Sequence, residues 1–348
     1  MKKFFYCLSI VLLLSCSKRN DNLDTQIEVP VSVEEIKVKS IEEFITTTAT
    51  AKAMQEATLK SESAGYYRLA ENIEKHRLFA LGDKVKAGEP IIFLENPEMA
   101  NTIKLESQKL NLDISQREFE KQQTLYEKGG VTLRELKNSE ITFIDAKYGY
   151  ENALIQLAKL KISSPFDGVI VDLPYYTAGI KMETGQLMAK VMNYRKLYAE
   201  VNLPGKEMGR IKTGQSIRVM NYTMPDDTLS GKVTQVSPAI DPETRSFKSL
   251  LQIENPEWLL RPGMFVKVEI TIARQDSALV IPKDIILTKQ RGNTVFIVEK
   301  GAAQERLLRT GIENPSQIEV LDGLNAGERL VVRGFETLQN NSKVKIMQ

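Results

Sequence analysis

The sequence predicts a mixed α and β, elongated multi-domain protein, in which a small β-module is split by a long antiparallel helical hairpin and followed by further β-domains. One glycine frame occurs twice, as GDKVKAG at residues 82–88 and GIKMETG at residues 179–185, each followed by a strand-like apolar run. The stretch between the two copies has the seven-residue apolar spacing of paired helices. The rest of the chain shows short Val- and Ile-rich runs separated by turn residues.

The N-terminus has the pattern of a secretory signal peptide. The basic start MKK is followed by about eleven apolar residues, too few to span a bilayer at about 1.5 Å per residue. The run ends at Leu13-Leu14-Ser15-Cys16, which resembles the lipobox of bacterial lipoproteins. We therefore expect a signal peptide over residues 1–15, lipid on Cys16 and a polar tether over residues 16–28. An ordinary signal peptide with an incidental cysteine is the alternative.

Composition limits the classes of function. The chain has 348 residues, of which 42% are hydrophobic and 26% charged, as is ordinary for a globular protein. Loss of Lys2 and Lys3 with the signal peptide would leave 45 basic and 45 acidic residues, so net charge does not favour nucleic acid. Cys7 would be lost and Cys16 lipidated, which excludes a disulfide and a thiolate metal site.

The hairpin is predicted from the pattern over residues 97–162. Pro97 and Glu98 suit a first helical turn, and neither proline nor glycine follows before about Glu127. A turn at Lys128-Gly129-Gly130 precedes a second helix to about Leu160, whose start carries a capping box of Thr132 and Glu135. Each arm has roughly 30 residues, so the hairpin would extend about 45 Å.

Two sets of residues at seven-residue spacing define the expected seam between the arms. They are Leu105, Leu112, Phe119 and Tyr126 in the first arm, and Leu136, Phe143, Tyr150 and Leu157 in the second. Mostly small residues lie three positions further along the second arm, at Ser139, Ala146, Ala153 and Leu160. The matching positions of the first arm are polar, so that arm is left free to face neighbours as well: Gln108, Ser115 and Gln122.

The β-domains are predicted on either side of the hairpin. Pro165 ends the helical pattern because it disfavours a helical Ser164. Residues 193–272 carry turn residues at the spacing of a small antiparallel barrel. Residues 29–60 and 273–348 are also rich in strand-forming runs.

Several short motifs follow one another in a specific order. They are SPFDG at 164–168, Gly179 with Gly185, Gly231-Lys232-Val233 with Ser237-Pro238, Thr244-Arg245, Leu260-Arg261-Pro262-Gly263-Met264, Ile281-Pro282, and GLNAGE at 323–328. Their order resembles that of the periplasmic adaptor subunits, or membrane fusion proteins, of resistance-nodulation-division (RND) tripartite efflux pumps. The resemblance covers about residues 30–345.

The resemblance implies a non-catalytic protein without a cofactor or bound metal, built from four modules. It implies an adaptor on the periplasmic side of a Gram-negative envelope that links a proton-driven inner-membrane transporter to an outer-membrane channel and serves export of drugs or other small molecules. The modules are the hairpin (97–162), a split lipoyl-like domain (61–96 plus 163–192), a β-barrel (193–272), and a membrane-proximal β-domain (29–60 plus 273–348) that includes the first barrel strand.

The resemblance also implies partners and a contact site. The partners are the RND transporter, the outer-membrane channel and further copies of the chain in a hexameric ring. The lipid anchor is expected in the inner membrane, although Ser17 after the cysteine favours outer-membrane sorting. In the family a basic residue, a leucine four further on and a serine seven after that mark the channel contact. Lys121, Leu125 and Thr132 have this spacing around Gly129 and Gly130, although lysine lacks the bidentate fork of the family's arginine.

Two other functions stay open. An adaptor of an ABC-type exporter or of a heavy-metal efflux pump would carry the same modules. A biotin or lipoyl carrier is suggested by Lys181 and the equivalent Lys84. True carriers bear that lysine on a hairpin that joins the two halves, whereas here the long helical hairpin joins them, so both lysines are expected to be surface turn residues.

Histidine and methionine raise further hypotheses. His76 is the only histidine, so it cannot form a multi-histidine metal site; it is expected to be solvated, with sensing of periplasmic pH as the alternative. Met182, Met188 and Met192 have strand spacing, which favours core packing over binding of a soft metal.

Overall fold

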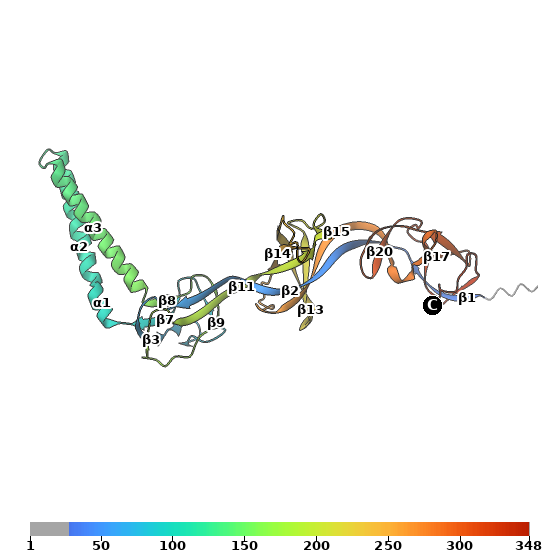
Figure 1. Ribbon diagram of the computed structural model, residues 1–348, viewed down its shortest axis with the longest axis horizontal. Helices are drawn as coiled ribbons and strands as arrows, with labels where there is room; N and C mark the ends of the chain where they lie inside the picture. Colours follow the sequence, from blue (N-terminus) through green and yellow to red (C-terminus); the bar gives the residue numbers. More distant parts are fainter. Residues whose placement is uncertain (1–27, 348) are drawn as a thin grey trace, which may run out of the picture. The chain divides into compact units, whose positions relative to one another are not determined.

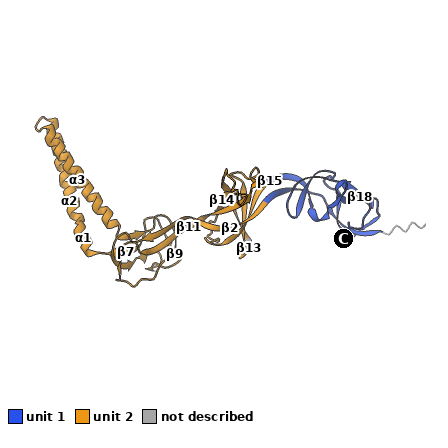
Figure 2. Ribbon diagram, viewed as in Figure 1, with its two compact units in different colours: residues 1–44, 273–348 blue, residues 45–272 orange. Residues whose placement is uncertain are grey.

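The computed structural model describes residues 28–347 and divides into two compact units (Figure 2). We call residues 1–44 with 273–348 the terminal unit and residues 45–272 the central unit. The predicted signal peptide and Cys16 lie outside the described residues. The fold is mixed α and β and multi-domain, as predicted. None of the described helices has the length and apolar character needed to span a membrane.

The described part of the terminal unit holds a six-stranded sheet in which the first and the last described strands lie side by side. Strand β1 (Val29–Glu35) pairs antiparallel with β21 (Arg329–Arg333) and parallel with β22 (Val344–Ile346). Val31 of β1 is buried with Phe296 and Val331. The other elements of this unit are η2 (Lys283–Ile285), β16 (Leu287–Lys289), β17 (Gly292–Glu299), β18 (Ala302–Leu307), β19 (Arg309–Glu313) and β20 (Gln317–Asp322).

Strands β2 (Val38–Lys60) and β15 (Phe265–Pro282) each run from one unit into the other. The remaining elements belong to the central unit and are drawn in Figure 1. Its strands are β3 (Gly65–Leu69), β4 (Glu71–Asn72), β5 (Arg77–Leu78), β6 (Lys84–Val85), β7 (Pro90–Glu95), β8 (Lys161–Ser163), β9 (Gly168–Asp172), β10 (Lys181–Met182), β11 (Leu187–Pro204), β12 (Ser216–Asn221), β13 (Met224–Val236) and β14 (Ser246–Glu254). Its helices are α1 (Pro97–Ile103), α2 (Leu105–Glu127), α3 (Leu133–Ala158) and η1 (Gly205–Glu207).

The two glycine frames interlock. All four glycines have φ between 80° and 89°, in the left-handed region that favours glycine. Each donates its N–H to a carbonyl of the opposite half: Gly82 to Ile170 (2.8 Å), Gly88 to Ser164 (2.7 Å), Gly179 to Tyr67 (2.8 Å) and Gly185 to Ser61 (2.8 Å). The halves share one core, which includes Val85 of the first frame and Met182 of the second. The segments 61–96 and 163–192 therefore form a single β-module.

Asp83, beside the first glycine, is a buried carboxylate that sequence reasoning missed. Its side chain is only 1% exposed and accepts hydrogen bonds from Lys75 Nζ (2.5 Å), from Arg77 (2.8 Å to each oxygen) and from the Ala80 N–H (2.9 Å). Burial by itself raises the pKa of Asp83, but the hydrogen bonds from Arg77, Lys75 and Ala80 outweigh it and hold that pKa well below its usual range. This clamp ties the β4–β5 hairpin to the module.

We expect Asp83→Asn to lower the free energy of unfolding of the module by about 2–4 kcal/mol, because a buried charge-assisted network is lost. A depressed carboxyl pKa stabilises the fold above the unfolded-state value of about 4, and that stability is lost as pH falls through the folded-state pKa. The deficit of the variant should thus be equal at about pH 5 and about pH 8 and shrink only under stronger acid. Thermal melting of both proteins across this range checks the prediction; a deficit that varies between neutral and mildly acidic pH would contradict it.

The helices correct one detail of the sequence prediction. The expected uninterrupted first arm is divided, because Lys104 (φ 48°) has a left-handed conformation between α1 and α2. Asn96 caps α1 by accepting the Met99 N–H at 2.9 Å. A left-handed lysine costs about 1–2 kcal/mol, so the local sequence does not select it. We attribute the break to the packing of α1 against α3.

Helices α2 and α3 pack against each other over their length (Figure 1). The predicted seam faces inward: Phe119 and Phe143 stack at 5.8 Å with nearly parallel rings, and Ala146 and Ala153 are buried. Ser115 is also buried, and Gln108 and Gln122 are half-buried. The polar positions of the first arm thus belong to the seam. Tyr126 departs from the prediction because it lies exposed at the end of α2.

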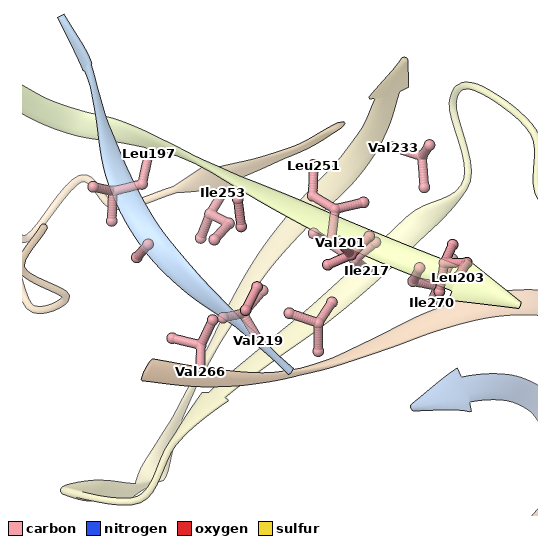
Figure 3. Packing of buried hydrophobic residues seen from close by; sticks show 14 of the residues in the cluster. Leu197, Val201, Leu203, Ile217, Val219, Val233, Leu251, Ile253, Val266 and Ile270 are labelled. Atoms are coloured by element: carbon pink, nitrogen blue, oxygen red, sulfur yellow. The ribbon is translucent and has the colours of Figure 1, made fainter. Parts of the chain in front are cut away.

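The barrel closes because β2 hydrogen-bonds to both β11 and β15, which complete a circuit through β14, β13 and β12. Alternate residues of these strands point inward, as Leu197, Val201 and Leu203 of β11 do in Figure 3. Phe247 is among the largest fully buried side chains. The same strand β11 continues from the β-module, so one strand serves both cores.

Candidate docking site at the hairpin tip

The turn between α2 and α3 is closed by backbone hydrogen bonds. The Leu125 carbonyl accepts the N–H groups of Lys128 (3.2 Å) and Gly130 (2.8 Å), and the Tyr126 carbonyl accepts that of Gly129 (2.9 Å). Gly129 has φ 74°, the left-handed conformation that commonly ends a helix. At Gly130 an added Cβ would be in ordinary van der Waals contact with Leu125, 3.4 Å from its carbonyl oxygen.

Thr132 starts α3 through the predicted capping box. Its hydroxyl accepts the Glu135 N–H at 3.3 Å, and the Glu135 carboxylate accepts the Thr132 N–H at 2.7 Å and its hydroxyl at 2.8 Å. These hydrogen bonds, that of the Thr132 N–H first, lower the pKa of Glu135. Thr132 therefore has a structural role that a serine in its place would also fill.

The structure brings the predicted contact residues to one end of the hairpin. Leu125 lies within the last turn of α2 and is half-buried, and Lys121 lies one turn before it with an exposed side chain. Lys121 Nζ is 3.3 Å from Glu118 Oε2, and Glu118 also accepts from Gln122 at 2.8 Å. The tip presents a cation, an apolar side chain and a hydroxyl on a hydrogen-bonded turn, a combination suited to contact with another protein.

A second seven-residue pattern lies on the outer face of α3. Ile141, Tyr148 and Ile155 are 57%, 64% and 57% exposed, and Leu110 and Ile114 of α2 are comparably exposed. We call the three residues of α3 the outer stripe. This repeat was not identified from the sequence, although its seven-residue spacing is visible there. Exposed residues repeating in this way are typical of a helix that packs against another helix.

The lysine, histidine and methionine residues discussed in the sequence analysis have structural positions in the fold. Lys84 and Lys181 are exposed in the short strands β6 and β10, each paired with the opposite half of the module. His76 is an exposed residue with φ 51° between β4 and β5. Met182 and Met188 are buried in the module core. Within residues 28–347, no group of three or more His, Cys, Asp or Glu side chains could hold a metal ion.

Two of the predicted family motifs are structural. In SPFDG, Asp167 accepts the Ala87 N–H at 2.8 Å and thereby holds the first glycine frame. In the barrel, Gly231 lies so close to β14 that a Cβ would be 2.1 Å from the Gln252 carbonyl oxygen. These motif residues preserve the fold, whichever partner the protein binds.

Family models match two adjoining parts of the chain. The CusB-like β-barrel domain matches residues 196–274, and the C-terminal permuted SH3 domain of RND membrane fusion proteins matches residues 277–337. The predicted β-barrel is thus confirmed, and the described strands of the terminal unit that follow it include an SH3-like domain.

Relatives and a solved structure agree with these matches. The multidrug/solvent efflux pump periplasmic linker protein MepA of Pseudomonas putida is 24% identical over 318 residues, which are 84% of this chain and 82% of MepA. The cobalt-zinc-cadmium resistance protein CzcB of Cupriavidus metallidurans is 21% identical over 262 residues, or 72% of this chain, which spans only 50% of CzcB. A crystallised MacA-MexA chimera with the Pseudomonas aeruginosa MexA α-hairpin has the same fold at a TM-score of 0.54, with 23% identity over 86% of this chain and 99% of the chimera.

Proposed function

We propose that this chain, a periplasmic adaptor of the RND type, links a proton-driven inner-membrane transporter to an outer-membrane channel in a tripartite efflux system. Its cargo would be drugs or other small molecules, by analogy with MepA, a linker of a multidrug/solvent efflux pump. The observation that carries the proposal is the order of domains along the chain. A helical hairpin is inserted between the two halves of a β-module, and the barrel and the SH3-like domain follow.

We assign the finer parts as follows. The interlocked module of residues 61–96 and 163–192 is lipoyl-like, residues 97–162 form an antiparallel coiled-coil hairpin, residues 193–272 the barrel, and residues 29–60 with 273–348 the membrane-proximal domain. Lys84 and Lys181 lie in short strands that pair across the module, and not on a hairpin that joins its two halves. This placement argues against a biotin or lipoyl carrier. An intact mass that carries lipid alone, on Cys16, would agree with both the anchor and this assignment.

The hairpin tip would dock the outer-membrane channel through Lys121, Leu125 and Thr132, on the turn formed by Gly129 and Gly130. Cross-linked purification of the protein from cell envelopes, followed by identification of the captured membrane proteins, tests the whole arrangement. An inner-membrane RND transporter and an outer-membrane channel are the expected partners. Capture of an ABC-type transporter in place of the RND transporter would overturn this part of the proposal.

We further propose that copies of the chain form a ring of six, the number that the resemblance to the family implies, by packing the outer stripe of one hairpin against α2 of the next. Leu110 and Ile114 offer apolar side chains on α2 for this contact. Isolated exposed apolar residues are common, but a repeat on one helix face supports a helix partner.

Exchange of Ile141 and Tyr148 for glutamate should weaken self-association strongly, because two carboxylates would have to be desolvated at the contact. The free energy of unfolding should change by less than about 0.5 kcal/mol, because both side chains are exposed in the single chain. Sedimentation velocity measures the association. Lys137→Ala, which removes only a surface pair with Glu140 on the same helix, is the matched control. Unaltered sedimentation of the double variant would refute the role of the outer stripe.

Export of divalent metal ions is a second candidate. It is favoured by the similarity to CzcB, a cobalt-zinc-cadmium resistance protein. Cells that lack the protein would then lose resistance to zinc, cobalt or cadmium and keep resistance to drugs and solvents. The opposite pattern is expected for the proposed function.

A further inference from the structure

The central unit contains a large open groove that none of the proposed contacts uses. It has a volume of about 1260 Å³ and is lined by β2, β9, β11, the loop before β6 and the loop between β14 and β15. Three exposed apolar side chains that no other contact explains line this groove: Met54, Leu81 and Val171. Small-molecule sites are concave, mostly apolar and furnished with a few placed polar groups.

An aromatic pair at the groove is held by a buried asparagine. Asn255 is fully buried, and its amide N–H₂ donates to the carbonyls of Tyr194 and Leu260, both at 2.8 Å, while its oxygen accepts the Leu260 N–H at 3.1 Å. This arrangement fixes the loop that carries Trp258, whose ring meets that of Tyr194 edge to face at 4.4 Å. Trp258 is therefore a preorganised wall of the groove.

The charge of the groove favours an anion. Its lining contains four basic side chains and two acidic ones: Lys52, Lys84, Lys190, Arg261, Glu56 and Glu257. Lys190 and Lys52 are engaged with Glu56 (2.6 Å) and Glu200 (3.6 Å). Within residues 28–347, neither Lys84 nor Arg261 forms an ion pair, and Lys84 Nζ lies 5.8 Å from the centre of the Trp258 ring.

A bound anion would give the Lys84 ammonium group a stronger interaction than the Trp258 ring does. An exposed cation–π contact is weak, whereas a charge-assisted hydrogen bond to a carboxylate or sulfonate is one of the stronger polar contacts. A flat apolar ring would meanwhile cover Trp258 and the neighbouring aliphatic side chains. We propose that this groove binds small aromatic anions, with Lys84 and Arg261 holding the acidic group and Trp258 contacting the ring.

The test uses the natural reporter at the site, since Trp258 is the only tryptophan. The chain from residue 17 onward is titrated with para-tert-butylbenzoate, and Trp258 emission is excited at the red edge, where neither the probe nor tyrosine absorbs. The corresponding benzyl alcohol and benzylammonium are the neutral and cationic comparisons. We expect a saturable change with the benzoate and at least about tenfold weaker binding of the other two compounds, because they lack the charge-assisted hydrogen bonds.

Variants locate the site. Lys84→Met and Arg261→Met should each weaken benzoate binding by about tenfold, and Glu257→Gln should strengthen it because a repelling charge is removed. Lys248→Met is the control, since Lys248 is an exposed lysine of the same barrel outside the groove. Equal affinity for all three compounds, no saturable response, or full affinity in Lys84→Met would overturn the inference. The measurement needs no partner protein, so its failure would leave the adaptor function untouched.

Discussion

Removal of residues 125–135, with the arms rejoined by a short glycine linker, should reduce export to that of cells that lack the protein. The deletion takes away Leu125, the turn glycines and the capping box, and so the whole proposed contact with the outer-membrane channel. The inner seam from Leu105 to Gln122 keeps its partners on α3, and the module and barrel cores lie elsewhere in the chain. Efflux of a fluorescent dye from intact cells measures export, and circular dichroism with thermal melting verifies the fold.

Two substitutions separate docking from turn formation. Leu125→Asp keeps the backbone carbonyl that closes the turn and places a charge where an apolar contact is expected, so it should reproduce most of the export defect. Thr132→Ser keeps the N-cap and should export normally. Undiminished dye efflux in the deletion would exclude the tip as the docking site.

The hairpin seam could be predicted because its signal is local. A helix brings residues seven apart to one face, so Phe119 and Phe143 could be assigned to the seam from spacing alone, and their rings do stack. The glycine frames were equally informative because glycine is the residue that most readily adopts positive φ. The break at Lys104 had no such signal, since the local sequence does not favour a left-handed lysine and we attribute it to the packing of α1 against α3.

Sites assembled from distant segments could not be predicted in the same way. Lys75, Arg77 and Asp83 resemble ordinary surface charges in the sequence, and only the fold of the β4–β5 hairpin buries the carboxylate among them. The groove at Trp258 draws residues from strands more than a hundred positions apart. The role of the tip residues rests on the resemblance to the family, because the turn geometry alone specifies a stable corner and no particular partner.

The second substitution with a large expected effect on stability is at Gly231 in the barrel. This residue of β13 pairs with Ile217 on one side and Ile253 on the other, in the middle of the barrel wall. A Cβ there would lie 2.1 Å from the Gln252 carbonyl oxygen and 3.0 Å from Ile217 Cδ1. The first contact is with backbone, so it can be relieved only by moving β14. The need for glycine is therefore one of space and not of left-handed conformation.

Gly231→Ala should lower the free energy of unfolding of the barrel by about 3 kcal/mol or more, because overpacking at a backbone contact forces the strands apart. Trp258 lies in the loop between β14 and β15, so its emission during urea unfolding follows the barrel specifically. Gly209→Ala is the matched control: nothing lies within 4 Å of its added Cβ. That substitution should leave stability unchanged or raise it by about 0.5 kcal/mol, since alanine restricts the unfolded chain. Unfolding of both variants at the same urea concentration as the parent would contradict the prediction. It would mean that β13 and β14 accommodate the added Cβ at no energetic cost, so that their close approach does not explain the glycine.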